Sequence, residues 1–156
     1  MILTKDLIDK QKKNINFPSR IFIDGKYKDS ISGEKFENIS PIDGKLINNI
    51  SFSQKEDVDL AVQAARNVFE KGSWSKADPS FRKKVMLKFA DLLEKNKLEL
   101  ALLDTIDVGK TINDTYNADV PASLDNIRWY AEIVDKIYDD IAPTPQNFIG
   151  MITKEP

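Results

Sequence analysis

Apolar residues recur at helical spacing in four segments between residues 53 and 138, and this series restricts the possible folds more than any other feature. The first segment opens with Ser53-Gln-Lys-Glu56, a capping-box pattern in which hydroxyl and carboxylate each bond an orphan backbone N–H. It stops at Gly72, which suits the left-handed position after a helix. The second segment begins at Asp78-Pro79, a cap followed by proline at the first helical position. Both segments are predicted to be helices with defined starting points.

Two more helices are predicted downstream. The third covers residues 97–108 and is ended by Gly109, and the fourth runs from about Asp119 to Tyr138 with Pro121 near its start. Each of the four helices has one apolar face, which is expected to be buried. These faces comprise Val58, Ala61, Val62, Ala65, Val68 and Phe69; Phe81, Val85, Phe89, Leu92 and Leu93; Leu98, Ala101, Leu102 and Ile106; and Leu124, Ile127, Tyr130, Ala131, Val134, Ile137 and Tyr138.

Short extended segments precede the helices. Residues 20–23 and 26–28 flank Asp24-Gly25, a pair that supplies the positive φ angles of a type I′ hairpin turn. Two further strands are expected around residues 36–39 and 46–50, where apolar residues lie between turn signals. The sequence therefore predicts a small antiparallel β element ahead of the helices.

The two ends of the sequence carry weaker signals. Residues 1–16 form a polar lead-in with some helical character. The stretch 142–146 is too rich in proline for a helix, and the strand-like run 147–154 follows it. No partner strand for that run is evident in the sequence pattern.

The sequence contains neither cysteine nor histidine. Without cysteine it offers no thiolate nucleophile and no cysteine-ligated metal site. Without histidine it lacks the side chain that most often acts as a general base. Lys and Arg number 23 and Asp and Glu 25, a balance that does not favour nucleic acid or an anionic membrane as a partner. No apolar run approaches the ~18 residues that span a bilayer, and the N-terminus lacks the apolar core of a secretory signal. A cytoplasmic location is expected.

One motif resembles a phosphate-binding loop. Gly109-Lys110 would need another glycine at the position of Asp104, and it follows a helix rather than a strand. Because a helix C-terminus presents carbonyl oxygens, which repel phosphate, a helix C-cap is the favoured interpretation. The six glycines are scattered singly and form no dinucleotide-binding GxGxxG.

Other chemistry-bearing residues have simple structural explanations. Glu94, Glu99, Asp104 and Asp107 could supply a carboxylate pair, but solvated surface charge is the favoured explanation. The two tryptophans, Trp74 and Trp129, are expected to be packing residues, because an aromatic platform for nucleic acid would need basic neighbours.

Read in order, several segments resemble the aldehyde dehydrogenase superfamily from about Phe17 to Pro156. Sequences of the γ-glutamyl-γ-aminobutyraldehyde and other aminoaldehyde dehydrogenases are the most similar. The segments are Ile21-Phe-Ile-Asp-Gly25, Phe36-Glu-Asn-Ile-Ser-Pro41 with Asp43-Gly44, Asp57-Val-Asp-Leu-Ala-Val-Gln-Ala-Ala-Arg66, Phe69-Glu-Lys-Gly-Ser-Trp74, Arg82, Ala90-Asp-Leu-Leu-Glu94, Leu100-Ala-Leu-Leu-Asp-Thr-Ile-Asp-Val-Gly-Lys110, Asp119-Val-Pro121, Ile127-Arg-Trp-Tyr-Ala-Glu132 and Lys154-Glu-Pro156.

The resemblance implies an α/β fragment, in which the β element and about four helices flank the nucleotide-binding sheet of the complete enzyme. On this basis residues 1–16 are a lead-in and 17–141 the N-terminal part of the NAD(P)-binding domain. Residues 142–156 then begin an oligomerisation arm, which is truncated here. In this family a cysteine thiolate attacks the aldehyde, a hydride passes to NAD or NADP, and a glutamate assists hydrolysis of the thioester. The catalytic Cys and Glu and the dinucleotide site are expected beyond residue 156.

The resemblance also implies two sites within these residues. Oxygens of Asn38, Ile39 and Asp107 match a monovalent-cation site, although a simple residue at a helix C-terminus is the favoured explanation for Asp107. Ala118, Asp119 and Ala122 match the substrate entrance, and a carboxylate there would attract the amino end of an aminoaldehyde. Capping of the fourth helix is the alternative explanation for Asp119.

Two hypotheses about function follow. The first is the N-terminal portion of an NAD(P)-dependent aldehyde dehydrogenase that oxidises an aldehyde, expected to be an aminoaldehyde, to a carboxylate. The complete enzyme would be a homo-oligomer, and the isolated portion is expected to be inactive and to bind no cofactor. The second is a non-catalytic helical interaction module derived from the same family.

Overall fold

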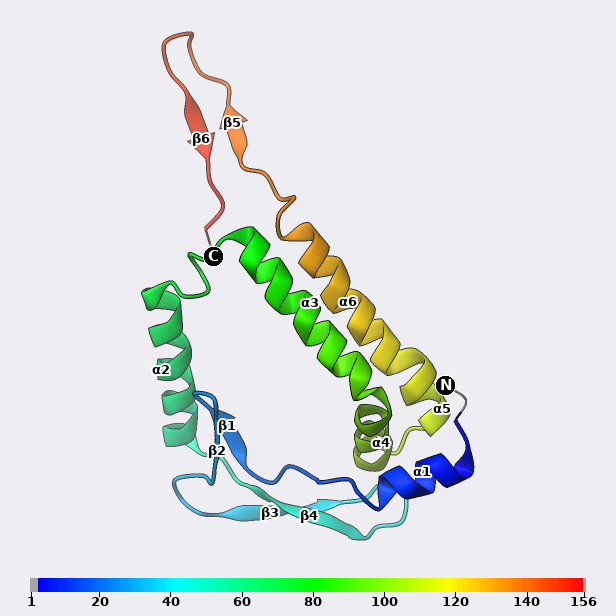
Figure 1. The fold of residues 1–156 in the computed structure, drawn as a ribbon. Helices are drawn as coiled ribbons and strands as arrows, with labels where there is room; N and C mark the ends of the chain where they lie inside the picture. The colour runs from blue at the N-terminus through cyan, green and yellow to red at the C-terminus, as the bar shows by residue number, and fades with distance from the viewer. Residues whose placement is uncertain (1–2, 156) are drawn as a thin grey trace.

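The structure, a computed structural model, describes residues 3–155 as a mostly helical chain with three separate two-stranded antiparallel sheets (Figure 1). No helix in this range is long and apolar enough to cross a membrane. The elements in order are α1 (Lys5–Lys12), β1 (Ile21–Ile23), β2 (Lys26–Lys28), β3 (Lys35–Ile39), β4 (Leu46–Ser51), α2 (Lys55–Lys71), α3 (Pro79–Lys95), α4 (Lys97–Val108), α5 (Ile112–Asp114), the π-helical turn η1 (Thr115–Asp119), α6 (Val120–Ile133), β5 (Asp140–Ala142) and β6 (Gly150–Ile152).

Two hairpins replace the one β element predicted for the first part of the chain. The β1–β2 turn has positive φ angles at Asp24 and Gly25, which confirms the type I′ prediction. Strands β3 and β4 form a second hairpin, whose register shifts between Asn38 and Ile39. A backbone bond from the Ser51 N–H to the Ser19 carbonyl (2.8 Å) connects β4 with the segment before β1.

The start of α2 lies one residue later than predicted. Gln54, not Ser53, is the N-cap, and Asp57, not Glu56, accepts the Gln54 backbone N–H at 3.1 Å. The other carboxylate oxygen of Asp57 accepts the Ile31 N–H at 3.0 Å. Asp57 is buried, so this carboxylate satisfies one donor of its own helix and one of the preceding loop.

The fourth predicted helix is also displaced. Its helical run begins at Ile112, capped by the Thr111 hydroxyl, and ends at Ile133 rather than Tyr138. Pro121 therefore lies inside the run, where it donates no backbone hydrogen bond and its ring would clash with the carbonyl four residues earlier. The chain widens into the π-helical turn η1 immediately ahead of Pro121, with the Val120 N–H bonded to the Thr115 carbonyl.

The strand-like run near the C-terminus has a partner, contrary to the sequence prediction. Strand β6 pairs antiparallel with β5, a segment whose apolar residues are too few to be recognised as a strand. The hairpin projects beyond the ends of α3 and α6 (Figure 1). Its pairing begins at Asp140, two residues before the predicted start of the arm.

The buried core is small and lies among α3, α4, η1 and α6. It contains the fully buried methyl groups of Ala90, Ala101 and Ala131 together with Leu102 and Leu124. Most of the apolar face predicted for α2 and α3 is exposed instead. The exposed members are Ala61, Ala65 and the larger Val58, Val62, Val68, Phe69, Phe81, Val85, Phe89 and Leu92.

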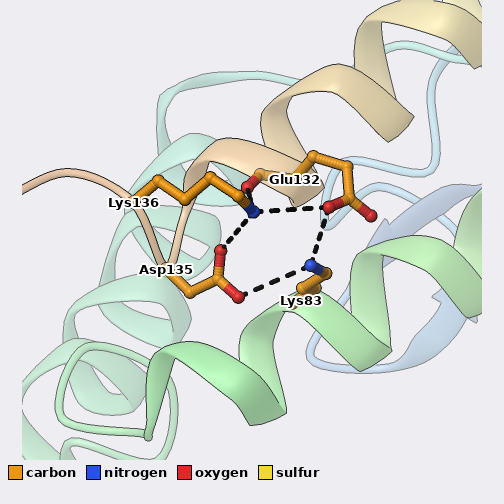
Figure 2. Close-up of polar contacts among 4 residues, drawn as sticks. All are labelled: Lys83, Glu132, Asp135 and Lys136. Carbon is orange, nitrogen blue, oxygen red and sulfur yellow. Dashed lines mark hydrogen bonds and ion pairs between the residues drawn. The ribbon is translucent and has the colours of Figure 1, made fainter.

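Helices α3 and α6 lie side by side (Figure 1), and ion pairs connect them at two levels. At one level the Lys83 ammonium contacts Glu132 at 2.7 Å and Asp135 at 3.4 Å (Figure 2). At the other, Arg128 contacts Glu94 at 2.5 Å and Asp91 at 3.4 Å. The beginning of α3 thus pairs with the end of α6, as expected for an antiparallel pair.

The same contacts shift the ionisation of this cluster. The hydrogen bond from Lys83 lowers the pKa of Glu132, and that from Lys136 lowers the pKa of Asp135. In turn, the hydrogen bond to Asp135 raises the pKa of Lys136. Each shift favours the charged form of the group.

We expect Lys83→Met to reduce the loss of stability in acid. A carboxyl group with a lowered folded-state pKa stabilises the fold above its unfolded pKa of about 4, and this stabilisation disappears as pH falls through the folded pKa. The substitution removes the hydrogen bond that lowers the pKa of Glu132 most, and it keeps an aliphatic side chain at position 83. Urea unfolding between neutral pH and pH ~3 measures the effect, with Lys88→Met in the same helix as the control. An unchanged pH dependence would contradict the assignment.

Replacement of Gly109 by alanine should destabilise the fold more than replacement of Gly44. Both glycines have positive φ, 80° and 68°, so each alanine incurs a backbone cost of about 1–2 kcal/mol. A Cβ at position 109 would also lie 3.1 Å from Pro41 Cγ, whereas nothing lies within 4 Å of one at position 44. The difference between the two variants in their loss of unfolding free energy, measured with urea, gives the cost of the Pro41 contact. Equal losses would show that this contact costs nothing.

Candidate functional site

Asn38 and Asp107, far apart in the sequence, meet between β3 and the last turn of α4. The Asn38 side-chain amide donates to Asp107 Oδ1 at 2.7 Å and lies 3.4 Å from Asn48 Oδ1 on β4. Asn48 donates in turn to the Pro18 carbonyl at 3.2 Å. These contacts border a cleft of about 320 Å³ lined by Phe17, Pro18, Asn38, Asn48, Ile50, Leu103, Asp104 and Asp107.

Ile39, the third member of the predicted cation site, follows Asn38 in the same strand. The register shift lies between these two residues, and a bulge leaves part of the local ladder unpaired. In the part of the chain that the structure describes, no group of three or more carboxylate, thiol or imidazole side chains comes together as a metal site. Any ion held here would therefore depend on amide and backbone oxygens beside the two carboxylates that line the cleft, Asp104 and Asp107.

The charge of Asp107 is not compensated within its helix. The last turn of α4 contains no basic residue, and the partial negative charge of a helix C-terminus disfavours a carboxylate there. Gly109 ends the helix in the left-handed conformation, with its N–H bonded to the Thr105 carbonyl. The C-cap prediction for Gly109-Lys110 is thereby confirmed, and no phosphate loop is formed.

The three residues predicted for the substrate entrance lie on adjoining turns. Ala118 and Asp119 belong to η1, and Ala122 follows in the first turn of α6. Both alanines are exposed and Asp119 is half-buried. Asp119 does not cap the fourth helix, because it has helical dihedral angles and lies inside the continuous run.

Asp119 forms an ion pair with Lys110 instead. The lysine Nζ lies 2.5 Å from Asp119 Oδ2, and the hydrogen bond raises the pKa of Lys110. Asp104 and Asp114 raise that pKa further through their charge. No sequence pattern predicts this pair, because its members are nine positions apart and an unpredicted helix start lies between them.

The base of η1 is fixed by buried polar and aromatic contacts. Thr115 is fully buried, and its hydroxyl lies 2.9 Å from that of Thr105 on α4. The adjacent Tyr116 is buried as well, with the Lys97 ammonium 4.1 Å from its ring centroid. These contacts hold the turn that carries Ala118 and Asp119 against α4.

An aromatic cleft continues along α6 from Ala122. Trp129 and Tyr130 pack edge to face with ring centroids 5.0 Å apart, and both rings are more than half exposed. With Asp125 and Asn126 they line a cleft of about 540 Å³. The prediction that Trp129 packs inside is therefore wrong for this structure.

Another cleft, of about 560 Å³, is apolar and lies between the β1–β2 hairpin and α2. Trp74 lines it and is less exposed than Trp129, at 41% against 58%. Its lining is Phe22, Ile23, Asp24, Gly25, Ala61, Ala64, Ala65, Val68, Phe69, Trp74 and Ser75. The cleft has few polar groups and, because the sequence contains no cysteine or histidine, no nucleophile of those types.

Comparison with known proteins identifies one family. The sequence model of the aldehyde dehydrogenase family matches residues 27–156. Aminoacetaldehyde dehydrogenase of Pseudomonas aeruginosa is 39% identical over 142 residues, which make up 91% of this chain and 29% of that protein. The NADP/NAD-dependent aldehyde dehydrogenase PuuC of Escherichia coli is 42% identical over 138 residues, or 88% of this chain and 28% of that protein.

Solved structures agree with the sequence match. The aldehyde dehydrogenase KauB from Pseudomonas aeruginosa superimposes with a TM-score of 0.95 at 41% identity, covering 99% of this chain and 31% of that one. A γ-glutamyl-γ-aminobutyraldehyde dehydrogenase from Burkholderia cenocepacia gives a TM-score of 0.92 at 36% identity, covering 96% and 30%. The chain thus spans a little under a third of the length of these relatives, and it belongs to the aldehyde dehydrogenase family.

Proposed function

We propose that these 156 residues act as the N-terminal part of an NAD(P)-dependent aldehyde dehydrogenase that oxidises an aminoaldehyde to a carboxylate. One observation carries the proposal. Nearly the whole chain superimposes on about one third of an aldehyde dehydrogenase at a TM-score of 0.95. Two relatives named for aminoaldehydes, acting on aminoacetaldehyde and γ-glutamyl-γ-aminobutyraldehyde, support the choice of substrate class.

The reaction needs groups that these residues do not supply. The family resemblance implies a cysteine nucleophile, and the sequence has no cysteine. NAD or NADP would accept a hydride from the aldehyde carbon. The residues present do not fit a dinucleotide, because the positive-φ glycines lie in turns or after helices rather than at a phosphate-binding helix N-terminus. The isolated portion is accordingly proposed to be inactive.

The exposed apolar faces support a role as part of a larger domain. Val62 and Phe69 on α2 and Phe81 and Phe89 on α3 are all at least two-fifths exposed. A monomeric protein rarely leaves apolar patches of this kind uncovered. We propose that these helices flank the nucleotide-binding sheet of the complete enzyme, with residues 17–141 belonging to its NAD(P)-binding domain.

Asp119, with Ala118 and Ala122, is proposed to form the substrate entrance. The two exposed methyl groups leave space beside the helix, and the half-buried carboxylate offers a negative charge for the ammonium end of an aminoaldehyde. The adjoining Trp129 and Tyr130 rings would extend this surface along α6.

Asn38, Ile39 and Asp107 are proposed to hold a monovalent cation. A cation would offset the unfavourable charge of Asp107 at the end of α4, which no basic residue of that turn balances. Rotation of the Asn38 amide by half a turn would present its oxygen where its nitrogen now donates to Asp107. The backbone carbonyl of Ile39, next to the register shift, would supply a further oxygen ligand.

The β5–β6 hairpin is proposed to belong to the arm through which the complete enzyme forms a homo-oligomer in the cytoplasm. Within residues 3–155 its two strands pair only with each other, and an edge strand offers N–H and C=O groups to another chain. Its apolar side chains are strongly exposed, as are those of its turn: Ile141, Phe148, Ile149, Met151 and Ile152.

The proposed function predicts activity only in a complete enzyme. A chimera in which residues 1–156 replace the matching part of the Pseudomonas aeruginosa aminoacetaldehyde dehydrogenase should reduce NAD(P) with aminoacetaldehyde. The isolated chain should not, because it lacks the nucleophile. Cofactor absorbance measures both reactions, and the relative without its matching part serves as the control.

Two results would overturn this proposal. Aldehyde-dependent NAD(P) reduction by the isolated chain would show that the chemistry lies within these residues. An inactive but folded chimera, combined with a monomeric isolated chain that unfolds cooperatively, would favour the helical interaction module instead.

The cation proposal predicts selective stabilisation by small monovalent ions. At equal ionic strength, K⁺ or Na⁺ should raise the melting temperature more than tetramethylammonium, which is too large for the site. Binding at about ten times Kd corresponds to about 1.4 kcal/mol of stabilisation. Asp107→Asn should abolish the difference, and Asp125→Asn on α6 should retain it. Equal effects of the three ions on the parent chain would exclude the site.

A further inference from the structure

We propose that Lys110 sets the selectivity of the substrate entrance, because its ion pair with Asp119 must be exchanged for the ammonium group of an incoming aminoaldehyde. The inference rests on the proposed function, which assigns Asp119 to that entrance. It adds a specificity-determining residue that comes from a different element and that touches the carboxylate directly.

The backbone on both sides fixes the position of the pair. Lys110 follows Gly109, whose left-handed conformation ends α4 and turns the chain toward α5. Thr111 then caps α5, with its hydroxyl 2.8 Å from Asp114 Oδ2. Asp119 is the last residue of η1, which Thr115 anchors to α4. Lys110 therefore lies in a three-residue connection between two helices, and Asp119 lies on a turn that is anchored to α4.

The pair is accessible to a competitor from solution. The Lys110 side chain is 47% exposed and that of Asp119 is 35% exposed. A half-exposed ion pair is only weakly stabilising, so another cation can replace the lysine at small cost. A lysine is suited to such exchange, because its ammonium is a single point charge on a flexible stem.

The surrounding charge favours cations over anions. Three carboxylates raise the pKa of Lys110: Asp119 on η1 through its hydrogen bond and charge, and Asp104 on α4 and Asp114 on α5 through their charge. Lys110 therefore lowers the attraction of this surface for a cationic aldehyde but does not reverse it. Removing its charge should strengthen that attraction, and a neutral aldehyde should be much less affected.

The test compares a short ω-aminoaldehyde with the unsubstituted aldehyde of equal length, using the full-length enzyme that contains these residues. Lys110→Met should raise the ratio of their kcat/KM values by up to about fivefold, the range expected for one exposed ion pair. The change should arise from KM for the aminoaldehyde, since Lys110 does not touch the reacting carbon. Lys110→Arg, which keeps the positive charge, should restore the parental ratio.

The variant Asp119→Asn tests whether the effect of Lys110→Met requires the Asp119 carboxylate. In that variant Lys110→Met should no longer raise the ratio, whereas Lys88→Met on α3 should leave it unchanged in either background. An unchanged ratio in Lys110→Met, or an equal rise when Asp119 is absent, overturns the inference. A parent enzyme that oxidises no aldehyde would instead overturn the proposed function, so the two failures are distinguishable.

Discussion

The arrangement of the other elements depends on the antiparallel contact between α3 and α6. Helix α4 packs against both of these helices. Three alanines there, Ala90, Ala101 and Ala131, are completely buried, so the helices approach closely where they meet. Arg128 then fixes the alignment by reaching Asp91 and Glu94 of α3. Lys83 does the same from α3, reaching Glu132 on α6 and Asp135 just past its end. This contact sets the orientation of the helical run from α5 through η1 to α6, and therefore the position of Asp119 on η1.

The rest of the molecule is held by polar contacts more than by apolar burial. The buried Asp57 carboxylate joins the start of α2 to the loop before β3, and Asn38 joins β3 to the end of α4. The large apolar side chains of α2 and α3 contribute little, because most of them face outward. Such a distribution suits a segment whose main apolar partner lies elsewhere, in agreement with its match to about a third of the related enzymes.

Local chemistry made several features predictable. The Asp24-Gly25 turn, the start of α3 at Asp78-Pro79 and the glycine stops at Gly72 and Gly109 follow from backbone preferences that need no tertiary partner. Each error had a non-local cause. Asp57 rather than Glu56 completes the cap because it also bonds Ile31, a residue distant in sequence.

In the candidate site, too, local sequence patterns predict some features, and contacts between distant residues determine the others. Asn38 and Asp107 were paired through family resemblance, and the contact between them was not visible from spacing. Pro121 suggested a helix start because proline is common there, but a π-helical turn accommodates it within the run. Ala131, buried without free space, lies about 18 Å from Asp119 along the helix at ~1.5 Å per residue. Any larger side chain there would act as a wedge, and a tilt of about 5° over this lever arm would move the carboxylate by roughly 1.5 Å. The position of the Asp119 carboxylate therefore depends on a residue near the opposite end of the same helix.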